Sequence, residues 1–175
     1  MEIFGEGTKI IQLVILGAAL ICGLYQDVRY LKISNKLNVM IAIMGLILAL
    51  FSGRTMLLSS LAGIAVPFVI GFVLFALRLF GAGDVKFFMA LGALMGYEWI
   101  LKCMIYSVFF GAAMAIVLMI VRGIFLERMR YMWNYLKSIF LTRKIREYQV
   151  MEDKKKQFFP FAIAICCGSL LTFVI

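Results

Sequence analysis

Six apolar stretches dominate this chain of 175 residues and constrain its fold more than any other feature. Hydrophobic residues make up 65% of the sequence and charged residues 15%, whereas soluble domains are roughly half apolar and a quarter charged. A soluble protein of this size has no interior large enough for so many apolar side chains, so the composition predicts a membrane protein. The stretches cover residues 10–25, 37–51, 56–79, 85–101, 103–121 and 158–175.

Most of these stretches are close to the ~20 residues that a spanning helix needs, and the second and fourth are shorter. We therefore expect an all-α membrane protein, a bundle of about six transmembrane helices that forms a single domain over residues 1–175. Tyr97, Glu98 and Trp99 are expected to form an interfacial turn between the fourth and fifth helices.

The basic residues predict how the chain is oriented. If the loops alternate between the two sides of the membrane, Lys9, Arg54 and Lys102 fall on one side and the other 15 of the 18 Lys and Arg residues on the opposite side. The positive-inside rule makes the richer side cytoplasmic, so both termini are expected outside in a multi-pass protein of the inner (plasma) membrane. The first stretch lacks the features of a cleaved signal peptide and is expected to remain in the mature protein. The orientation of the chain in the membrane also explains its net charge of +9, so the charge does not indicate binding of nucleic acid.

Residues 123–156 form the longest segment outside the apolar stretches. Aromatic and aliphatic residues alternate there with Arg and Lys at helical spacing, which predicts an amphipathic cytoplasmic helix on the anionic inner leaflet. Docking of a substrate or partner is the alternative function for this segment.

The absence of histidine excludes Ser-His and Cys-His nucleophilic sites and the H-E-x-x-H zinc site. The four cysteines show no C-x-x-C spacing, so neither a zinc site nor a disulfide framework is expected. Ser34 with a nearby lysine is a poor candidate, because those lysines lie among loop charges and are not desolvated. We therefore expect carboxylate chemistry without a metal or a cofactor.

Asp27 and Asp84 are the candidate catalytic residues. They lie at the edges of apolar stretches, where ionisable side chains are costly and often functional. Each aspartate alone has a second explanation, as an N-cap that only starts the next helix. Because the chain crosses the membrane twice between them, both return to the cytoplasmic boundary. Two adjacent carboxylates share one proton and so provide a base and an acid together.

Four neighbouring residues are expected to shape this site. Gly81 and Gly83 lack Cβ atoms, which lets an extended peptide approach the backbone beside Asp84. Lys86 either lowers the pKa of a nearby carboxyl group or extends its side chain to the interface. Asn35 either contacts the substrate or caps a helix.

Several motifs resemble the prepilin peptidases, membrane aspartic proteases of the GxGD type, especially the small forms of tight-adherence (Flp) pilus systems. The similar residues are Asp27 followed by Ile33 and Asn35, the sequence from Gly81 to Lys86, and Phe159-Pro160-Phe161-Ala162. The resemblance covers essentially the whole chain. It departs from the family at Ser34, where the family usually has proline, which puts the geometry of that loop in question.

The resemblance implies a function. Asp27 and Asp84 would be the catalytic aspartates, and the substrate a pilin-like precursor whose leader is cut at the cytoplasmic membrane face, after a glycine next to the hydrophobic stem. Larger relatives also methylate the new N-terminus and carry an insertion with paired C-x-x-C motifs, which this chain lacks, so we expect no methyltransferase domain. Archaeal preflagellin peptidases share the two-aspartate pattern and remain an alternative.

Two functions of other classes compete with a peptidase. A small ion- or proton-coupled transporter or channel subunit would use Asp27 and Asp84 to bind a cation or relay protons, which favours carboxylates near the middle of the membrane. A scaffold subunit would use the basic segment for docking but would leave the glycines and the paired aspartates unexplained.

Overall fold

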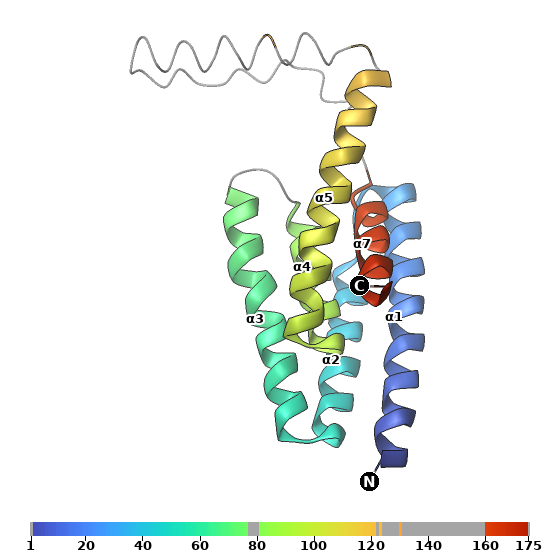
Figure 1. Cartoon of the computed structure of the whole chain (residues 1–175), viewed down its shortest axis with the longest axis vertical. Coiled ribbons are helices and arrows are strands. Elements are labelled where there is room, and N and C mark those ends of the chain that lie inside the picture. Colours follow the sequence, from blue (N-terminus) through green and yellow to red (C-terminus); the bar gives the residue numbers. More distant parts are fainter. Residues whose placement is uncertain (1, 77–80, 122, 124–129, 131–159, 175) are drawn as a thin grey trace, which may run out of the picture. The chain divides into compact units, whose positions relative to one another are not determined.

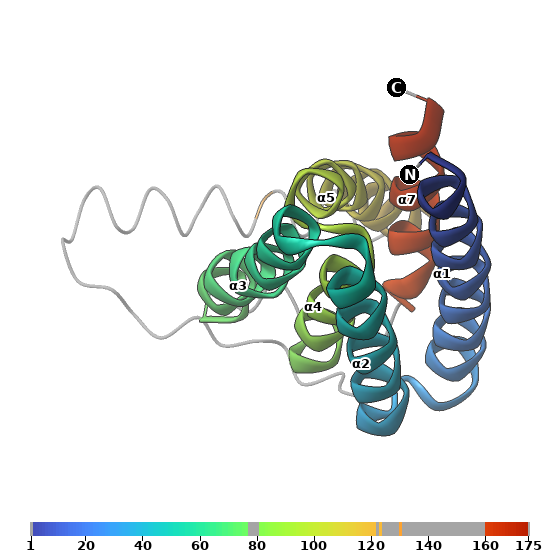
Figure 2. The ribbon, with the colours of Figure 1, turned by 90° about the horizontal axis from the view of Figure 1, so that it is seen from below.

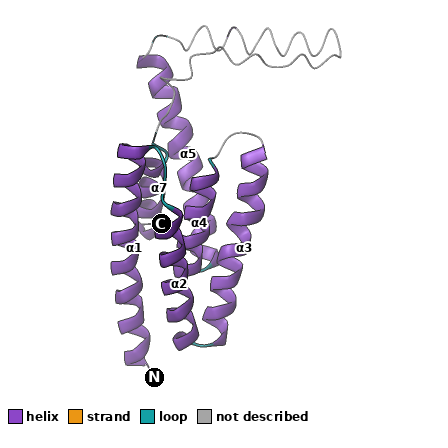
Figure 3. Ribbon diagram, turned by 180° about the vertical axis from the view of Figure 1, so that it is seen from behind, coloured by secondary structure: helices purple, strands orange, loops and turns teal. Residues whose placement is uncertain are grey.

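The computed structural model describes residues 2–76, 81–121, 123, 130 and 160–174, and in these ranges all regular secondary structure is helical (Figure 3). This result confirms the all-α membrane fold. The helices, labelled in Figure 1, are α1 (Glu2–Tyr30), α2 (Asn35–Ser52), α3 (Arg54–Ala76), α4 (Ala82–Met95), α5 (Tyr97–Val121) and α7 (Ala162–Val174).

The chain divides into two compact units, of which the first covers residues 1–110 and 159–175 and the second residues 111–158. The first unit contains α1 to α4, the beginning of α5 and all of α7. Apart from Gly123 and Arg130, the expected amphipathic segment 123–156 lies outside the described residues. Its structure and the single-domain organisation therefore stay predictions.

Four of the described helices are long and apolar enough to cross a membrane, namely α1 from Gly7 onward, α2, α3 and α5. Their outward faces carry many exposed large apolar side chains, as lipid contact requires. In contrast, α4 has 14 residues and α7 has 13. At about 1.5 Å per residue these two helices are about 20 Å long, less than the ~30 Å thickness of the hydrocarbon core.

The boundary between the fourth and fifth helices differs from the sequence expectation. We expected an apolar helix over residues 85–101 and a turn at Tyr97, Glu98 and Trp99, but α4 ends at Met95 and these three residues form the first turn of α5. The break lies at Gly96, whose φ of 87° is a conformation that favours glycine.

Helix α4 forms the centre of the first unit. Eight of its 14 residues are buried, and both Phe87 and Phe88 are fully inaccessible. It packs mainly against α2 and α3 and also contacts α1, and Figure 2 shows it between α2 and α3. A short helix that is surrounded in this way has its position set by its neighbours.

Small residues allow this close packing. The backbones of Gly63 in α3 and Gly92 in α4 are in direct contact, so a Cβ at either position would collide with the opposite glycine. Gly45 in α2 faces the backbone of Ala93 in the same way, since a Cβ there would lie 2.7 Å from its carbonyl carbon. Without a hydrophobic driving force between helices in lipid, such contacts supply much of the packing energy.

Candidate active site

Both candidate aspartates lie at the same end of the first unit. Asp27 is in the last turn of α1 and Asp84 in the first turn of α4, and Figure 1 shows the end of α1 and the beginning of α4 at the same end of the helices. Asp27 is buried, with 7% of its surface exposed, and Asp84 is half-buried.

Helices α1 and α4 pack closely next to the two aspartates. A Cβ at Gly23 would lie 2.7 Å from the tip of the buried Phe87 ring, so the ring fits only because position 23 is glycine. Gly23 lies one helical turn before Asp27, and Phe87 lies about one turn after Asp84. The contact therefore sets the separation of α1 and α4 one helical turn away from the carboxyl groups.

The carboxylate of Asp27 is held by the beginning of α7. The backbone N–H of Ala162, the first residue of α7, donates a hydrogen bond of 2.9 Å to Asp27 Oδ2. The first N–H groups of a helix have no partner within the helix and favour an anionic acceptor. Asp27 starts no helix itself, since α1 continues to Tyr30 and Ser34 caps α2, so the N-cap explanation for Asp27 is wrong.

Asp84 is the third residue of α4 and lies outside the four helices of spanning length. Its Oδ2 accepts a hydrogen bond of 3.2 Å from the backbone N–H of Gly81, the N-cap residue. Burial, together with the negative charge of Asp27, raises the pKa of Asp84 to about 6, while the bond from Gly81 acts in the opposite direction. The two carboxyl groups are therefore close enough to interact electrostatically, and Asp84 also supports the start of its helix.

The loop after α1 has a defined structure next to Asp84. The N–H of Ser34 donates a hydrogen bond of 2.8 Å to Gln26 Oε1, and Ile33 is buried with 3% of its surface exposed. A Cβ at Gly83 would lie 4.0 Å from the backbone nitrogen of Ile33, so this loop lies beside the Gly81-Ala82-Gly83 turn.

Ser34 stands where the similar family usually has proline. Its φ of −67° is one that proline also adopts. The substitution therefore leaves the path of the loop compatible with the family pattern. Serine adds the N–H that bonds Gln26, which proline lacks.

Asn35 and Lys86 contact each other. The Lys86 ammonium group donates a hydrogen bond of 3.2 Å to Asn35 Oδ1, which links the start of α4 to the start of α2. Asn35 is the first residue of α2 and Ser34 is its N-cap, so the capping explanation for Asn35 is wrong.

The two glycines differ in how much their positions require glycine. At Gly81 a Cβ would lie 3.0 Å from Asp84 Oδ2 and would crowd the carboxylate. At Gly83 the nearest atom would be at ordinary contact distance, and neither residue has a positive φ. Local packing therefore does not account for glycine at position 83, which is compatible with a role in leaving space for a ligand.

Sequence analysis missed Asn38, which lies one turn after Asn35 on α2. Its side chain is buried, with 5% of its surface exposed, and within residues 2–76, 81–121 and 160–174 neither its amide nitrogen nor its amide oxygen has a hydrogen-bond partner. The sequence feature that could have identified Asn38 is that it is a single amide side chain inside the second apolar stretch. The contact between Ala162 and Asp27 was also missed, because a backbone donor leaves no signal in side-chain identity.

In the described ranges, no group of three or more Cys, Asp or Glu side chains is arranged to hold a metal ion. The expectation of a metal-independent site stays a prediction.

A comparison with known protein families identifies the chain. Residues 14–116, more than half of the sequence and including both aspartates, match the type IV leader peptidase family. The chain belongs to this family. This leader peptidase is a multi-pass membrane protease, and its family implies pilin-like precursors as substrates. No curated protein and no solved structure matches the chain.

Proposed function

We propose that this leader peptidase is an aspartic endopeptidase in which Asp27 and Asp84 together activate water to cut the leader from a pilin-like precursor. One observation carries the proposal. Burial and, second, the negative charge of Asp27 raise the pKa of Asp84 to about 6, so Asp84 keeps its proton more readily than an exposed aspartate and interacts with a second carboxylate.

The surroundings of the two groups suggest a division of roles. Asp27, which accepts the N–H of Ala162, is the base that takes a proton from water as the water oxygen bonds to the peptide carbonyl carbon. Asp84, whose raised pKa favours its protonated form, donates a hydrogen bond to the carbonyl oxygen as negative charge develops there. When the C–N bond breaks, the proton of Asp84 passes to the leaving amine, and the proton now on Asp27 restores the shared state.

The distribution of charge supports a cytoplasmic site. Basic residues of the described part that lie near the aspartates are Arg29, Lys32, Lys36 and Lys86. At the opposite end of the helices the basic residues are Lys9, Arg54 and Lys102. By the positive-inside rule the aspartates face the cytoplasm and both termini face outward across the inner membrane.

Substrate geometry is also part of the proposal. The hydrophobic stem of the precursor lies in the bilayer and presents the bond after its glycine at the level of Asp84. Gly81 and Gly83 leave the backbone of this turn accessible to an extended peptide. Tight-adherence (Flp) pilins are the proposed substrate class, and no methyltransferase activity accompanies cleavage. A transporter would favour carboxylates at mid-membrane, whereas Asp27 and Asp84 lie at helix ends.

The test is to express a precursor with the full chain and with the variants Asp27→Asn and Asp84→Asn. Each exchange keeps the size of the side chain and removes its titration, so processing should fall by roughly 10²–10⁴-fold with unchanged membrane insertion. Glu98→Gln is the matched control, because Glu98 is an exposed carboxylate at the first turn of α5. Normal processing by both aspartate variants would refute the proposal.

A further inference from the structure

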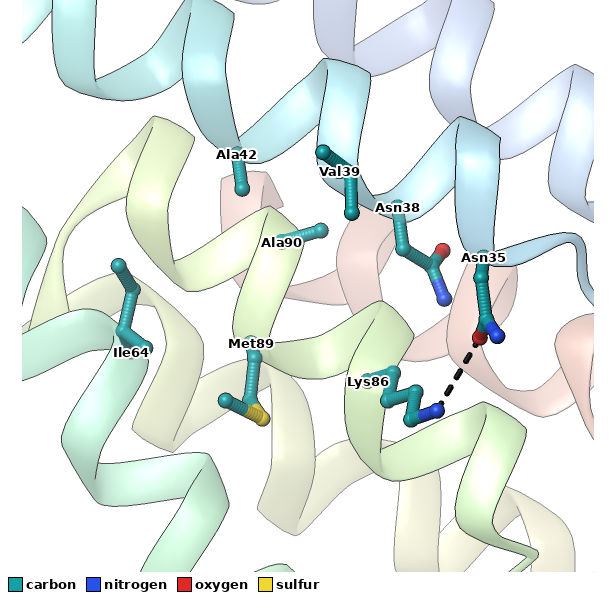
Figure 4. Close-up of a pocket in the computed structure, with 8 residues that line it drawn as sticks. All are labelled: Asn35, Asn38, Val39, Ala42, Ile64, Lys86, Met89 and Ala90. Carbon is teal, nitrogen blue, oxygen red and sulfur yellow. Dashed lines mark hydrogen bonds between the residues drawn. The ribbon is translucent and has the colours of Figure 1, made fainter.

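A pocket of about 380 Å³ lies next to the beginning of α4, on the side that faces α2 and α3 (Figure 4). Three polar side chains, Asn35, Asn38 and Lys86, lie together at one end of it, and the remaining lining is apolar. A mostly apolar cavity of this size with a few converging polar groups is typical of a ligand site. The apolar lining residues are Val39, Ala42, Ile64, Met89 and Ala90.

Asn38 is the residue that indicates a ligand in this pocket. Its side chain is more than nine-tenths buried and lines the pocket, yet in the described part of the chain its amide nitrogen and oxygen both lack a hydrogen-bond partner. Buried polar groups are almost always paired, because an unpaired one loses its hydration without compensation. A leucine at position 38 would avoid this cost, so asparagine there is explained by a partner that arrives from outside the chain.

The chemistry of Asn38 restricts that partner. The amide presents a donor and an acceptor side by side, and its complement is a group with an acceptor next to a donor. In an extended chain the N–H and the C=O of one residue have this arrangement, because both point to the same side of the chain. The phosphate and ester groups of a phospholipid only accept hydrogen bonds and would leave Asn38 Oδ1 unpaired. Lys86, which already bonds Asn35, has further N–H groups for a carbonyl oxygen of the same peptide.

We propose that this pocket is a substrate subsite in which Asn38 pairs with the N–H and the C=O of one residue in an extended segment of the precursor. The inference rests on the proposed peptidase function and adds a specific residue to substrate recognition. It places part of the substrate on the α2 side of α4, while the scissile bond lies beside Asp84.

The two places are within reach of one short peptide. Asp84 and Lys86 are two positions apart and therefore point about 200° apart around α4. A helix with its side chains is about 10 Å across, and an extended chain advances about 3.3 Å per residue. The substrate residue that pairs with Asn38 is thus roughly three or four residues from the scissile bond. Gly81 and Ala82 are exposed, so the path across the first turn of α4 carries no large side chain.

The test measures KM and kcat with a synthetic precursor peptide that contains a short leader, a glycine and an apolar stem. Asn38→Leu should raise KM about tenfold and change kcat little, because it removes binding that is equal in the ground and transition states. Ala42→Leu, which fills the pocket from the same helix, should raise KM in the same way. Ile47→Leu, on the exposed face of α2 outside the pocket, is the matched control and should leave KM unchanged.

Protein folding is checked separately by unfolding in detergent. Because Asn38 has no hydrogen-bond partner among the residues that the structure describes, Asn38→Leu should be at least as stable as the wild type. A purely structural role for Asn38 predicts the opposite result, a less stable variant with an unchanged KM, and would overturn the inference.

A second series of measurements identifies the substrate residue that pairs with Asn38. Each backbone N–H near the cleavage site of the synthetic peptide is replaced in turn by N-methyl. One replacement should raise KM about tenfold with the wild type and have no further effect with Asn38→Leu, because both changes remove the same hydrogen bond. Additive effects at every position would overturn the inference.

The outcomes separate this inference from the proposed function. If Asp27→Asn and Asp84→Asn abolish cleavage but Asn38→Leu and Ala42→Leu leave KM unchanged, the subsite is wrong and the catalytic pair stands. If the aspartate variants still cut while the N-methyl coupling to Asn38 is present, the subsite stands and the catalytic pair is wrong. If KM instead follows the phosphatidylglycerol content of the vesicles, and Asn38→Leu removes this dependence, a lipid occupies the pocket and the inference is overturned.

Discussion

The proton on Asp84 is the residue-scale feature with the clearest consequence for activity. Burial and the charge of Asp27 raise its pKa from 3.8 to about 6, so the acid form persists at pH values where an exposed aspartate is ionised. The proposed mechanism requires this acid form. Activity should therefore be lost as the pH rises through the pKa of Asp84 and not as it falls through it.

We expect kcat/KM to decrease above pH 6 by about tenfold per pH unit, because one proton must be present in the active enzyme. The measurement is a pH–rate profile with the synthetic precursor in detergent, together with unfolding at each pH to exclude loss of the fold. A profile that stays flat between pH 5 and 8 would contradict the assignment of Asp84 as the acid.

At the scale of the elements, the position of α4 decides where Asp84 lies. This helix is too short to span the bilayer, and contacts with α2 and α3 hold it in place. The tightest contact joins the backbones of Gly63 and Gly92, where no side chain fits between the helices. The start of α4 is in turn held by the bond from Lys86 to Asn35.

Gly92→Leu should destabilise the protein by about 1–3 kcal/mol and reduce processing, because the added side chain forces α4 away from α3. Unfolding in mixed micelles measures the stability of the variant. The rate of precursor cleavage shows whether moving α4 displaces Asp84 from its position in the site. Gly17→Ala is the control, since a Cβ at this helical position in α1 meets no other atom within 4 Å. If the two variants were equally stable, the contact between Gly63 and Gly92 would contribute little to the stability of the fold.

On the scale of the whole molecule, the orientation in the membrane decides which precursors meet the aspartates. The proposed arrangement places the short turn at Gly53 outside and Gly123 in the cytoplasm. Alkaline phosphatase fused after Gly53 should be active and the same enzyme fused after Gly123 inactive, since this reporter folds only outside the cytoplasm. Matched expression of both fusions is the control, and the reverse pattern of activity would invert the proposed orientation.

The sequence by itself determined the fold class and the candidate aspartates. Apolar stretches indicate membrane helices because their free energy of transfer into lipid is favourable. This free energy depends on the composition of each stretch and not on the neighbouring helices. Asp27 and Asp84 stood out for the same reason, as charges at the edges of such stretches. The match to the leader peptidase family confirms the class of protein that these patterns predicted.

Other features were decided only by the tertiary structure. Helix α4 ends at Met95, before Gly96, and not at a turn over Tyr97, Glu98 and Trp99, because the chain turns where a glycine with positive φ permits it, and hydropathy does not predict backbone conformation. The unpaired amide of Asn38 and the bond from Ala162 to Asp27 depend on which atoms of distant segments meet. The free energy of transfer into lipid is a sum over single residues and can be read from the sequence. A contact between two helices depends on how they pack, so only the tertiary structure determines which atoms meet.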